Sequence, residues 1–457
     1  MSSECLTLEQ LAQQVEQGEI DTVAVVFADL YGRLLGKRCD ASFFLDSVAE
    51  SGTHGCNYLV TVDMEMEPVE GYEAANWDLG YGDFHLQPDL GTLRKASWLD
   101  RTAIVQCNLD DDSTHQPVAV APRSLLNAQI QAAATLGYVA QAASELEYYL
   151  LMQSYREATE SGFQNLVASG WYLEDYHTLQ ATRQEGYHGA LRRALASSGI
   201  PVESTKGEWG LGQHEINIRY CELLEMADRH VLLKQAAKEI AIEQQVSVTF
   251  MAKLKQDQAG SSCHLHLSLW NDEGNVFPGD QMMGDIACSD QFRWFLGGWI
   301  AHAAEFMPFY APNVNSYKRY QPGSWAPTTL AWSRDNRTAG FRVVGNGPSL
   351  RIECRIPGAD CNPYLAYTAA LASGLDGIAN QIEPADAFDG NAYKAADVAS
   401  TPLDLVTATE LFAASSFVQE ALGADVQQHY SHFFATEMTA YRQAVTDWER
   451  HRYFERI

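Results

Sequence analysis

Two histidines and a serine alternate with leucines in the stretch 263–270, which reads CHLHLSLW. Strict alternation of polar and apolar residues predicts a β-strand with one polar and one apolar face. His264, His266 and Ser268 share the polar face, and the chain enters the strand through a turn that begins at Gly260. This pattern indicates either a functional site or the solvated face of a strand at the edge of a sheet.

Three other stretches alternate in the same way, with charged residues on one face and apolar residues on the other. Their polar positions are Glu145 and Glu147 in the first, Glu215, Asn217 and Arg219 in the second, and Arg351, Glu353 and Arg355 in the third. If the four strands share one sheet, their apolar faces bury against helices. The other faces then form a cup lined with Glu, His and Arg side chains.

The acidic residues and one imidazole form a candidate metal site. Five carboxylates repel one another unless a cation lies between them. A ligand set dominated by oxygen favours Mg²⁺ or Mn²⁺ over structural Zn²⁺. The candidate ligands are Glu145, Glu147, Glu208, Glu215, His264 and Glu353. The alternative interpretation places each glutamate on a separate, solvated edge.

Arginines form a second candidate group. Guanidinium groups bind carboxylates and phosphates in a two-pronged geometry, and together with two metal ions they suit phosphoryl transfer. The members are Arg319, Arg337, Arg342, Arg351 and Arg355. The alternative for any one of them is a surface salt bridge. The sequence has neither a GxxxxGK[ST] motif nor a GxGxxG motif before a helix, which disfavours a P-loop or a Rossmann nucleotide site.

The elements that must position these residues follow from the same periodicities. We expect strands at residues 21–30, 34–38, 103–109 and 246–253, and helices at 6–18, 122–136, 187–198, 228–245, 291–306, 363–379, 403–422 and 425–446. Residues 80–94 are expected to form an ordered loop and residues 156–186 an irregular segment. The polar turn at 110–115 is the expected boundary between domains 1–115 and 116–457.

Composition argues against several classes of protein. The formal net charge of −28 disfavours general binding to nucleic acids, which requires basic surfaces. No apolar run reaches the roughly 18 residues that a membrane-spanning helix needs, and the N-terminus has no signal-peptide core. The nine cysteines are scattered without a CxxC pair, which favours reduced thiols and a cytoplasmic location.

Seven motifs in order along the chain resemble those of the glutamine synthetase superfamily. They are SELEYYL (144–150), KGEWGLGQHEIN (206–217), GSSCHLHLSLW (260–270), NSYKR (315–319), NRTAGFR (336–342), RIECR (351–355) and NPYLAYTAALASGLDGI (362–378). The segments FADLYGRLLGK (27–37) and GYGDFHLQPDLGTLR (80–94) resemble the small domain of the same family. The resemblance implies an α+β fold, with a small N-terminal β-grasp domain and a large catalytic domain whose curved antiparallel sheet is flanked by helices.

The resemblance also implies a role for each motif residue. Glu147, Glu208 and Glu215 match the ligands of one metal ion, and Glu145, His264 and Glu353 match those of a second. Positions that contact the nucleotide match His266, Ser268 and Arg351, and positions that hold glutamate match Gly260, Arg319 and Arg355. Residues around the transferred phosphate match Arg337 and Arg342.

Enzymes with these motifs use ATP with two or more Mg²⁺ or Mn²⁺ ions to phosphorylate the γ-carboxylate of L-glutamate. An amine then displaces phosphate from the γ-glutamyl phosphate. The family also implies a homo-oligomer, usually two stacked hexameric rings, with sites shared between subunits.

The flap that covers the amine site departs from the ammonia-using pattern. Those enzymes read NSYKRLVPGxEAP, whereas this chain reads NSYKRYQPGSWAP, so that Trp325 replaces the flap glutamate. Tryptophan offers an apolar, π-rich wall and cannot accept a proton. Ala259 also replaces an asparagine that contacts glutamate in the family.

A tryptophan at this flap position resembles the family branches that join glutamate to polyamines, ethanolamine, alkylamines or aniline. We therefore predict a γ-glutamyl ligase for a small organic amine, with Trp325 in the amine pocket and Asp63 as a weak candidate for the proton acceptor. Two alternatives stay open: a glutamine synthetase that uses ammonia, in which Trp325 only packs the loop, and a non-catalytic member of the family.

Overall fold

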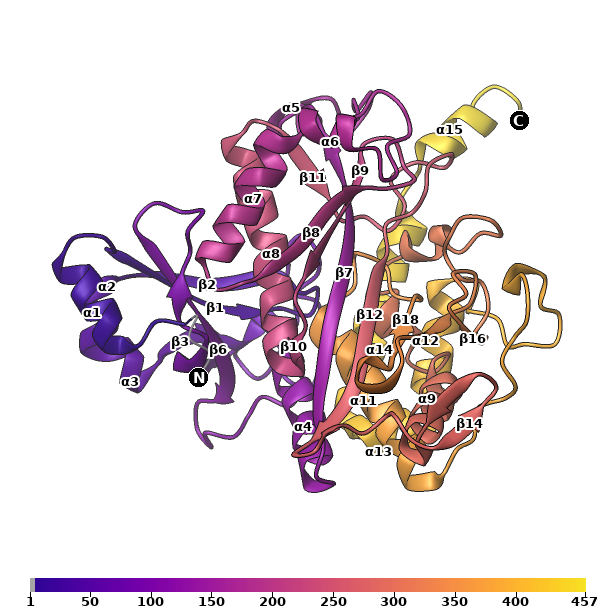
Figure 1. Cartoon of the computed structure of the whole chain (residues 1–457). Helices are drawn as coiled ribbons and strands as arrows, with labels where there is room; N and C mark the ends of the chain where they lie inside the picture. The colour runs from indigo at the N-terminus through magenta and orange to yellow at the C-terminus, as the bar shows by residue number, and fades with distance from the viewer. Residues whose placement is uncertain (1–4) are drawn as a thin grey trace.

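The computed structural model describes residues 5–457, which form an α+β molecule with two large sheets (Figure 1). The first sheet has the strand order β2-β1-β6-β4-β3, and β5 pairs with β6. Its strands are β1 (Thr22–Ala28), β2 (Leu34–Asp40), β3 (Thr53–Cys56), β4 (Asp83–Pro88), β5 (Arg94–Lys95) and β6 (Thr102–Asp111). The helix α1 (Leu8–Glu16) precedes it, and the short helices α2 (Ala41–Phe43) and α3 (Ala49–Ser51) follow β2.

Strand β4 lies inside the segment that the sequence predicted to be a loop, so that prediction was wrong. Phe84, Leu86 and Pro88 are buried, whereas Asp83 is exposed. The alternation that marks a strand is therefore present. It extends over only six residues, follows two glycines and ends at Pro88, which concealed it.

The second sheet has the strand order β16-β17-β18-β12-β7-β9-β8. Its strands are β7 (Val139–Leu151), β8 (Val202–Gly207), β9 (Gln213–Ile218), β12 (Cys263–Asn271), β16 (Trp332–Arg334), β17 (Phe341–Val344) and β18 (Arg351–Cys354). All pairs along this order are antiparallel except β16 with β17. The strands β10 (Cys221–Glu222) and β11 (Ser247–Thr249) pair with β7, and β13 (Gly274–Asn275) pairs with β12. Strands β14 (Gln281–Met283) and β15 (Ile286–Cys288) form a separate hairpin.

Strands β7 and β12 are the long central strands of this curved sheet (Figure 1). The helices α4 (Pro122–Thr135), α8 (Leu223–Glu243), α9 (Asp290–His302) and α11 (Pro363–Asn380) pack with one another and with the sheet. Pro122 opens α4, and Gly137 follows its end at φ +81°, as expected for the two ends of a helix. The predicted combination of a curved, mainly antiparallel sheet with flanking helices is confirmed.

The remaining helices connect and cover these layers. They are α5 (Tyr155–Glu160), α6 (Thr178–Arg183), α7 (Glu185–Ser197), α10 (Met307–Tyr310), α12 (Leu405–Ala414), α13 (Ser416–Leu422), α14 (Ala424–Gln443) and α15 (Asp447–Tyr453). Helices α5 and α6 lie in the segment that was predicted to be irregular. The predicted helix at 403–422 is two helices, because the hydroxyl of Ser415 accepts a hydrogen bond from the backbone N–H of Val418 and starts α13.

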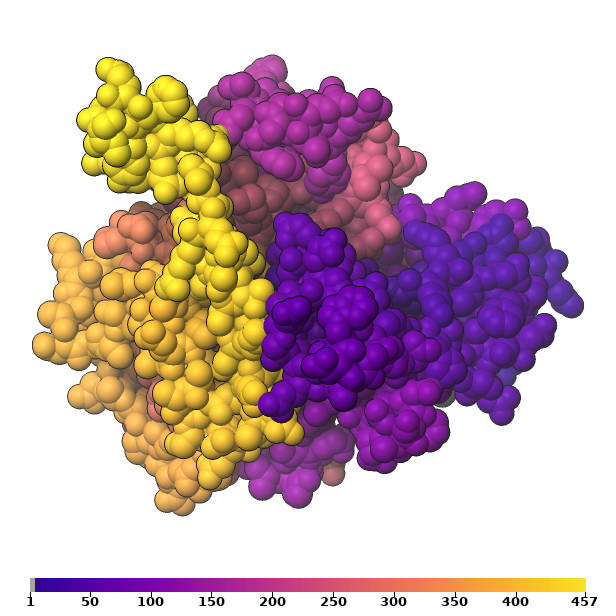
Figure 2. Space-filling view, turned by 180° about the vertical axis from the view of Figure 1, so that it is seen from behind, coloured from indigo at the N-terminus to yellow at the C-terminus, as the bar shows by residue number. Residues whose placement is uncertain are grey.

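Helix α14, the last but one of the chain, lies against the N-terminal part, as Figure 2 shows. His432 Nε2 lies 2.8 Å from the backbone oxygen of Glu70, and the ring of Tyr72 packs between His429 and His432. The first sheet ends at Asp111 and the second begins at Val139. The division of the chain at residue 115 stays a prediction. Within residues 5–457, no helix combines the length and the apolar character needed to cross a bilayer.

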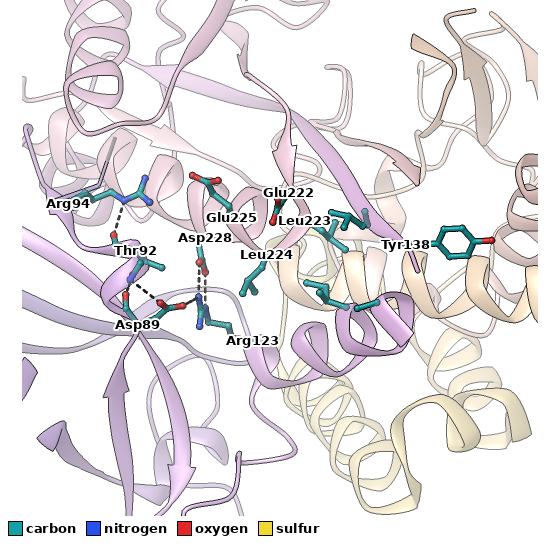
Figure 3. A pocket seen from close by; sticks show the side chains of 15 residues that line it. Asp89, Thr92, Arg94, Arg123, Tyr138, Glu222, Leu223, Leu224, Glu225 and Asp228 are labelled. Carbon is teal, nitrogen blue, oxygen red and sulfur yellow. Dashed lines mark hydrogen bonds and ion pairs between the residues drawn. The ribbon is translucent and has the colours of Figure 1, made fainter. Parts of the chain in front are cut away.

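A buried ion-pair network joins the two parts of the chain at the start of α4 (Figure 3). The guanidinium of Arg123 donates two hydrogen bonds to Asp228, at 3.0 and 2.9 Å, and one to Asp89 at 2.7 Å. It also donates to Asn108, and Tyr364 donates to Asp228 at 2.6 Å. Asp89 and Asn108 belong to the N-terminal part, whereas Asp228 lies on α8 and Tyr364 on α11.

We expect Arg123→Ala to destabilise the protein strongly, because it leaves the carboxylate of Asp228 buried without its cation. Breaking a buried pair in this way costs about 3–5 kcal/mol of unfolding free energy. The measurement is a denaturant or thermal unfolding curve. As a control, Arg156→Ala removes an exposed pair with Glu160 on α5, and such pairs contribute little. Equal losses for the two variants would contradict the importance of the buried network.

Candidate active site

The register of the second sheet confirms that the four predicted strands are neighbours. The paired positions are Glu145 with His264 and Asn217, Glu147 with Glu215, His266 with Glu353, and Glu353 with Arg342. Residues that pair across antiparallel strands point to the same face, so these side chains form the predicted cup. Arg219 is the exception, because it follows the end of β9 and is exposed.

One end of the cup gathers Glu145, His264 and Glu353. Each offers one ligand atom, and these atoms lie within 4.8 Å of one another. His264 Nδ1 is 3.3 Å from Glu145 Oε2 and 3.8 Å from Glu353 Oε1. His266 Nε2 also lies 2.9 Å from Glu145 Oε1. Burial opposes ionisation of Glu145, but the hydrogen bonds with the two histidines outweigh it and hold its pKa below the usual range.

The other end gathers Glu147, Glu215 and His264, whose ligand atoms also lie within 4.8 Å. Burial is the main cause that raises the pKa of Glu147 to about 8 and that of Glu215 to about 9, and the charge of Glu208 raises both further. Glu208 is not in either 4.8 Å group; its carboxylate accepts a hydrogen bond from Lys206 instead. In this half of the cup the negative charge is not balanced by the protein.

Three residues of this half escaped the sequence analysis. Gln213 donates a hydrogen bond to Glu147 Oε2 at 3.2 Å, and the backbone N–H of Ser262 donates to the same oxygen at 2.7 Å. Lys206 neutralises Glu208. The alternation in β9 could have indicated Gln213, which has the same parity as Glu215. Lys206 and Ser262 carry no such signal.

The chemistry of these donors fits divalent cations. His264 Nε2 is buried and has no hydrogen-bond partner among the described residues. Burial, with the nearby Arg355 guanidinium, lowers the pKa of His264 to about 4, so the imidazole is neutral and able to bind a metal. A cation between Glu147 and Glu215 would stabilise the ionised form of both carboxyls, which burial disfavours. The two predicted ligand sets are therefore brought together, with Glu208 at their margin.

Two arginines of the cup hold Glu353. Arg342 donates to Glu353 Oε2 at 2.8 Å and Arg355 donates to Oε1 at 2.6 Å. Although burial opposes it, the charge of Arg355 lowers the pKa of Glu353 to about 2. Arg342 also donates to the exposed Asp335. Both arginines therefore lie where an anionic substrate would meet the cup.

Arg319 is buried and supports Arg355. It donates to Ser262 Oγ and to the backbone oxygens of Arg355 and Ile356 at 2.7–2.9 Å. A Cβ added at Gly260 would lie 2.6 Å from the Arg319 side chain and 2.6 Å from the backbone oxygen of Ala252. Only glycine fits at this position.

The predicted nucleotide residues continue along β12 and β18. Arg351 Nε lies 3.1 Å from His266 Nδ1. Ser268 is buried and accepts a hydrogen bond from the indole of Trp270 at 2.9 Å. Arg337 stands apart: it is exposed in the turn between β16 and β17, and within the described chain no hydrogen bond or ion pair holds it.

Trp325 lines a cavity of about 520 Å³ beside the cup, together with Trp171, Tyr172 and Trp209. Ala259, the residue before Gly260, lines it too. Asp63 is elsewhere, because its carboxylate accepts hydrogen bonds from the backbone N–H groups of Glu65 and Glu67 at 3.0 and 2.9 Å. That geometry caps a turn, and within the part of the chain that the structure describes no contact joins Asp63 to the cup.

Comparison with known proteins agrees with this arrangement. Residues 119–453 match the family described as glutamine synthetase, catalytic domain. The chain belongs to the glutamine synthetase family. It is 45% identical to the γ-glutamylethanolamide synthetase of Streptomyces coelicolor, over 99% of this chain and 96% of that protein. It is 36% identical to the glutamate–isopropylamine ligase of a Pseudomonas species, over 97% of each chain.

More distant relatives include the glutamine synthetase of Thermotoga maritima, at 29% identity over 98% of this chain and 99% of that protein. A solved complex of GmaS with ADP has a TM-score of 0.84 at 27% identity and covers 97% of this chain and 99% of that one. The family and fold predictions are thereby confirmed. Enzymes of this family use ATP and divalent metal ions, and the acidic and histidine groups of the cup can bind such ions. The individual roles of the site residues stay predictions.

The raised pKa of Glu215 predicts a pH dependence of the metal-free protein. Between about pH 5 and pH 9 the folded protein retains a proton that the unfolded chain has released, so folding stability falls as the pH rises through this window. We expect the thermal midpoint of the wild type to fall by several degrees relative to Glu215→Gln between pH 6 and pH 8.5 in EDTA. Mg²⁺ should restore the thermal midpoint of the wild type at the higher pH but have no such effect on Glu215→Gln, because binding requires the ionised carboxylate of Glu215.

Glu160→Gln changes an exposed carboxylate on α5 and serves as the control. A constant difference between the wild type and Glu215→Gln at both pH values would contradict the assignment of a buried, protonated Glu215.

Proposed function

We propose that this protein joins the γ-carboxylate of L-glutamate to a small organic amine with the use of ATP. The γ-glutamyl phosphate is the intermediate, and ADP and phosphate are released. The observation that carries the proposal is Trp325, which lies beside an aromatic cavity instead of the flap glutamate of ammonia-using enzymes. Two relatives at 45% and 36% identity, named for ethanolamide and isopropylamine products or substrates, support it.

The residues of the cup would hold two divalent ions, one at each end. Glu145, His264 and Glu353 would hold one divalent ion, and Glu147 and Glu215, with Glu208 released from Lys206, would hold the other. When bound, these ions offset the negative charge of the triphosphate and of the γ-carboxylate. The protein contributes fixed positions for both ions, because their ligands lie on paired strands rather than on loops.

Arginines bind the anionic parts of the substrates. Arg355 would bind a carboxylate of glutamate, and Arg319 holds it by donating to its backbone oxygen at 2.9 Å. Arg342 would stabilise the phosphoryl group during transfer, because its side chain lies on β17, is 16% exposed and can exchange Asp335 for a more strongly charged partner. Arg337 lies in the turn before β17 and would contact the same phosphoryl group.

The nucleotide would lie along the β12 and β18 side of the cup. His266, Ser268 and Arg351 follow one another on this face, and Arg351 is the cation best placed for phosphates. Holding ATP on one side and the aromatic cavity on the other orients the γ-carboxylate between the two. Such positioning provides much of the rate of phosphoryl transfer.

We further infer a cytoplasmic homo-oligomer of stacked hexameric rings. Exposed apolar side chains at the C-terminal end support an association of chains: Trp448, Phe454 and Ile457 are 60%, 90% and 96% exposed, and Figure 1 shows α15 projecting from the body of the molecule. Contiguous exposed apolar groups mark contact surfaces.

The test of the proposed function is phosphate release from ATP with glutamate and Mg²⁺. The panel of acceptors contains ammonium, methylamine, ethanolamine, isopropylamine, putrescine, spermine and aniline. We expect one organic amine to give a kcat/KM at least about tenfold above that of ammonium, because an aromatic wall favours an organic cation. Mass spectrometry identifies the γ-glutamyl amide.

A higher kcat/KM for ammonium than for every organic amine would instead identify a glutamine synthetase. No turnover, combined with no thermal stabilisation by ATP and Mg²⁺, would indicate a non-catalytic member of the family.

A further inference from the structure

The cavity beside the cup has room and aromatic surface for more than an ammonium ion. Its volume is about 520 Å³, whereas an ion of the size of water takes up roughly 30 Å³. Its lining combines Trp171, Tyr172, Trp209 and Trp325 with one carboxylate, Asp257, and one cation, Lys253, whose ammonium donates a hydrogen bond to the backbone oxygen of Gln258 at 2.6 Å. Aromatic faces attract organic cations, and tryptophan does so most strongly. The cavity therefore has the size and chemistry for an ammonium group that carries an organic substituent.

Trp325 is held in an unusual backbone conformation toward this cavity. Its φ of +65° lies in the left-handed region, which bulky residues avoid. Its side chain nevertheless stays 45% exposed rather than buried in the core. Strained positions of this kind persist where surrounding structure imposes them, and they occur most often at functional sites. Packing alone does not explain a strained tryptophan that remains half in solvent.

Trp209 is the partner of Trp325. The two indole rings meet edge to face, with centroids 5.6 Å apart and planes at 62°. Trp209 is 48% exposed, so the contact uses only part of each ring and leaves aromatic surface for a ligand. The two tryptophans come from separate parts of the chain, the loop after β8 and the flap after residue 320.

Hydrogen bonds tie the Trp209 loop to the cup. The backbone N–H of Glu208 donates to the oxygen of Gln213 at 2.9 Å, and the N–H of Gly210 donates to Gln213 Oε1 at 2.9 Å. The side chain of Gln213 in turn donates to Glu147 Oε2 at 3.2 Å and to the backbone oxygen of Gly260 at 3.0 Å. The backbone at Trp209 is thus held in place, because Gln213 bonds to both of its neighbours, Glu208 and Gly210, and also to Glu147 in the cup.

We propose that Trp209 and Trp325 together form the wall that selects the acceptor, and that this wall takes a short-chain primary organic ammonium ion in preference to ammonium. The inference rests on the proposed function and adds Trp209 as a specificity-determining residue. The substituent of the amine lies against the two indole rings, and its nitrogen points toward the cup. Ammonium has no substituent to contact this wall and gains little from it.

The experiment compares Trp209→Ala and Trp209→Phe with the wild type in the phosphate-release assay. Kinetics are measured with the best organic amine of the panel and with ammonium, at saturating ATP, glutamate and Mg²⁺. We expect Trp209→Ala to raise the KM for the organic amine about tenfold, while its kcat/KM for ammonium stays within about twofold. Trp209→Phe keeps an aromatic face and should stay close to the wild type. Trp77→Ala, which removes an exposed tryptophan that does not line this cavity, is the matched control.

The outcomes distinguish the proposed function from the proposed role of Trp209. If the wild type prefers ammonium, the proposed function fails, whatever Trp209 does. If the wild type prefers an organic amine but Trp209→Ala keeps the same KM for it, only the selecting role of Trp209 is wrong. If the KM for the organic amine and the KM for ammonium rise together in Trp209→Ala and in Trp209→Phe, the residue supports the loop of Glu208 and does not select the amine. A selective rise that Trp209→Phe prevents confirms the proposal.

Discussion

The cup depends on one electrostatic constraint: five carboxylates share one largely buried sheet region. The two halves meet this constraint differently. Around Glu145 and Glu353, the histidines and Arg342 and Arg355 supply hydrogen bonds and positive charge, and both carboxyls have lowered pKa values. Around Glu147 and Glu215 the protein supplies too little positive charge, and both pKa values are raised. Only the second half needs an added cation to become ionised at neutral pH.

This asymmetry makes the two halves respond differently to pH. The carboxyls of Glu145 and Glu353 are ionised at neutral pH without a bound cation, whereas at Glu147 and Glu215 a metal ion would have to displace a proton. Lys206 donates a hydrogen bond to Glu208 beside this second half. Metal binding by the second half would therefore depend on pH near neutrality, whereas the charge of the first half would not.

The cup depends on the register in which β7 pairs with its neighbouring strands. A shift by one residue would turn Glu145 and Glu147 to the helix side. Strand β7 pairs with β12 on one edge and β9 on the other, and its helix side is fixed by polar contacts as well. Ser144 Oγ lies 2.8 Å from the hydroxyl of Tyr367 on α11 and 3.1 Å from His230 Nδ1 on α8. The charged face is thus held from behind by two helices.

Much of this arrangement could be predicted from the sequence, because alternation in a strand fixes which residues share a face. Glu145, Glu147, Glu215, His264 and Glu353 were found on that basis, and the register brings them together. The sequence carries no comparable signal for which strands, far apart along the chain, pair with one another. Lys206, Ser262 and Trp209 lie on turns and strand ends, where position depends on tertiary contacts. Strand β4 was not predicted because six residues that follow two glycines and end in a proline resemble a loop.

Trp325 and a flap glutamate would attract an ammonium group by different interactions. A flap glutamate would add a further carboxylate next to a cup whose second half already lacks positive charge. An aromatic face attracts a cation through its quadrupole and adds no net charge. Trp325 therefore offers an ammonium group a cation–π contact without adding a carboxylate to the flap. Tryptophan cannot accept a proton, so in the proposed reaction the binding of the amine and the removal of its proton would fall to different groups.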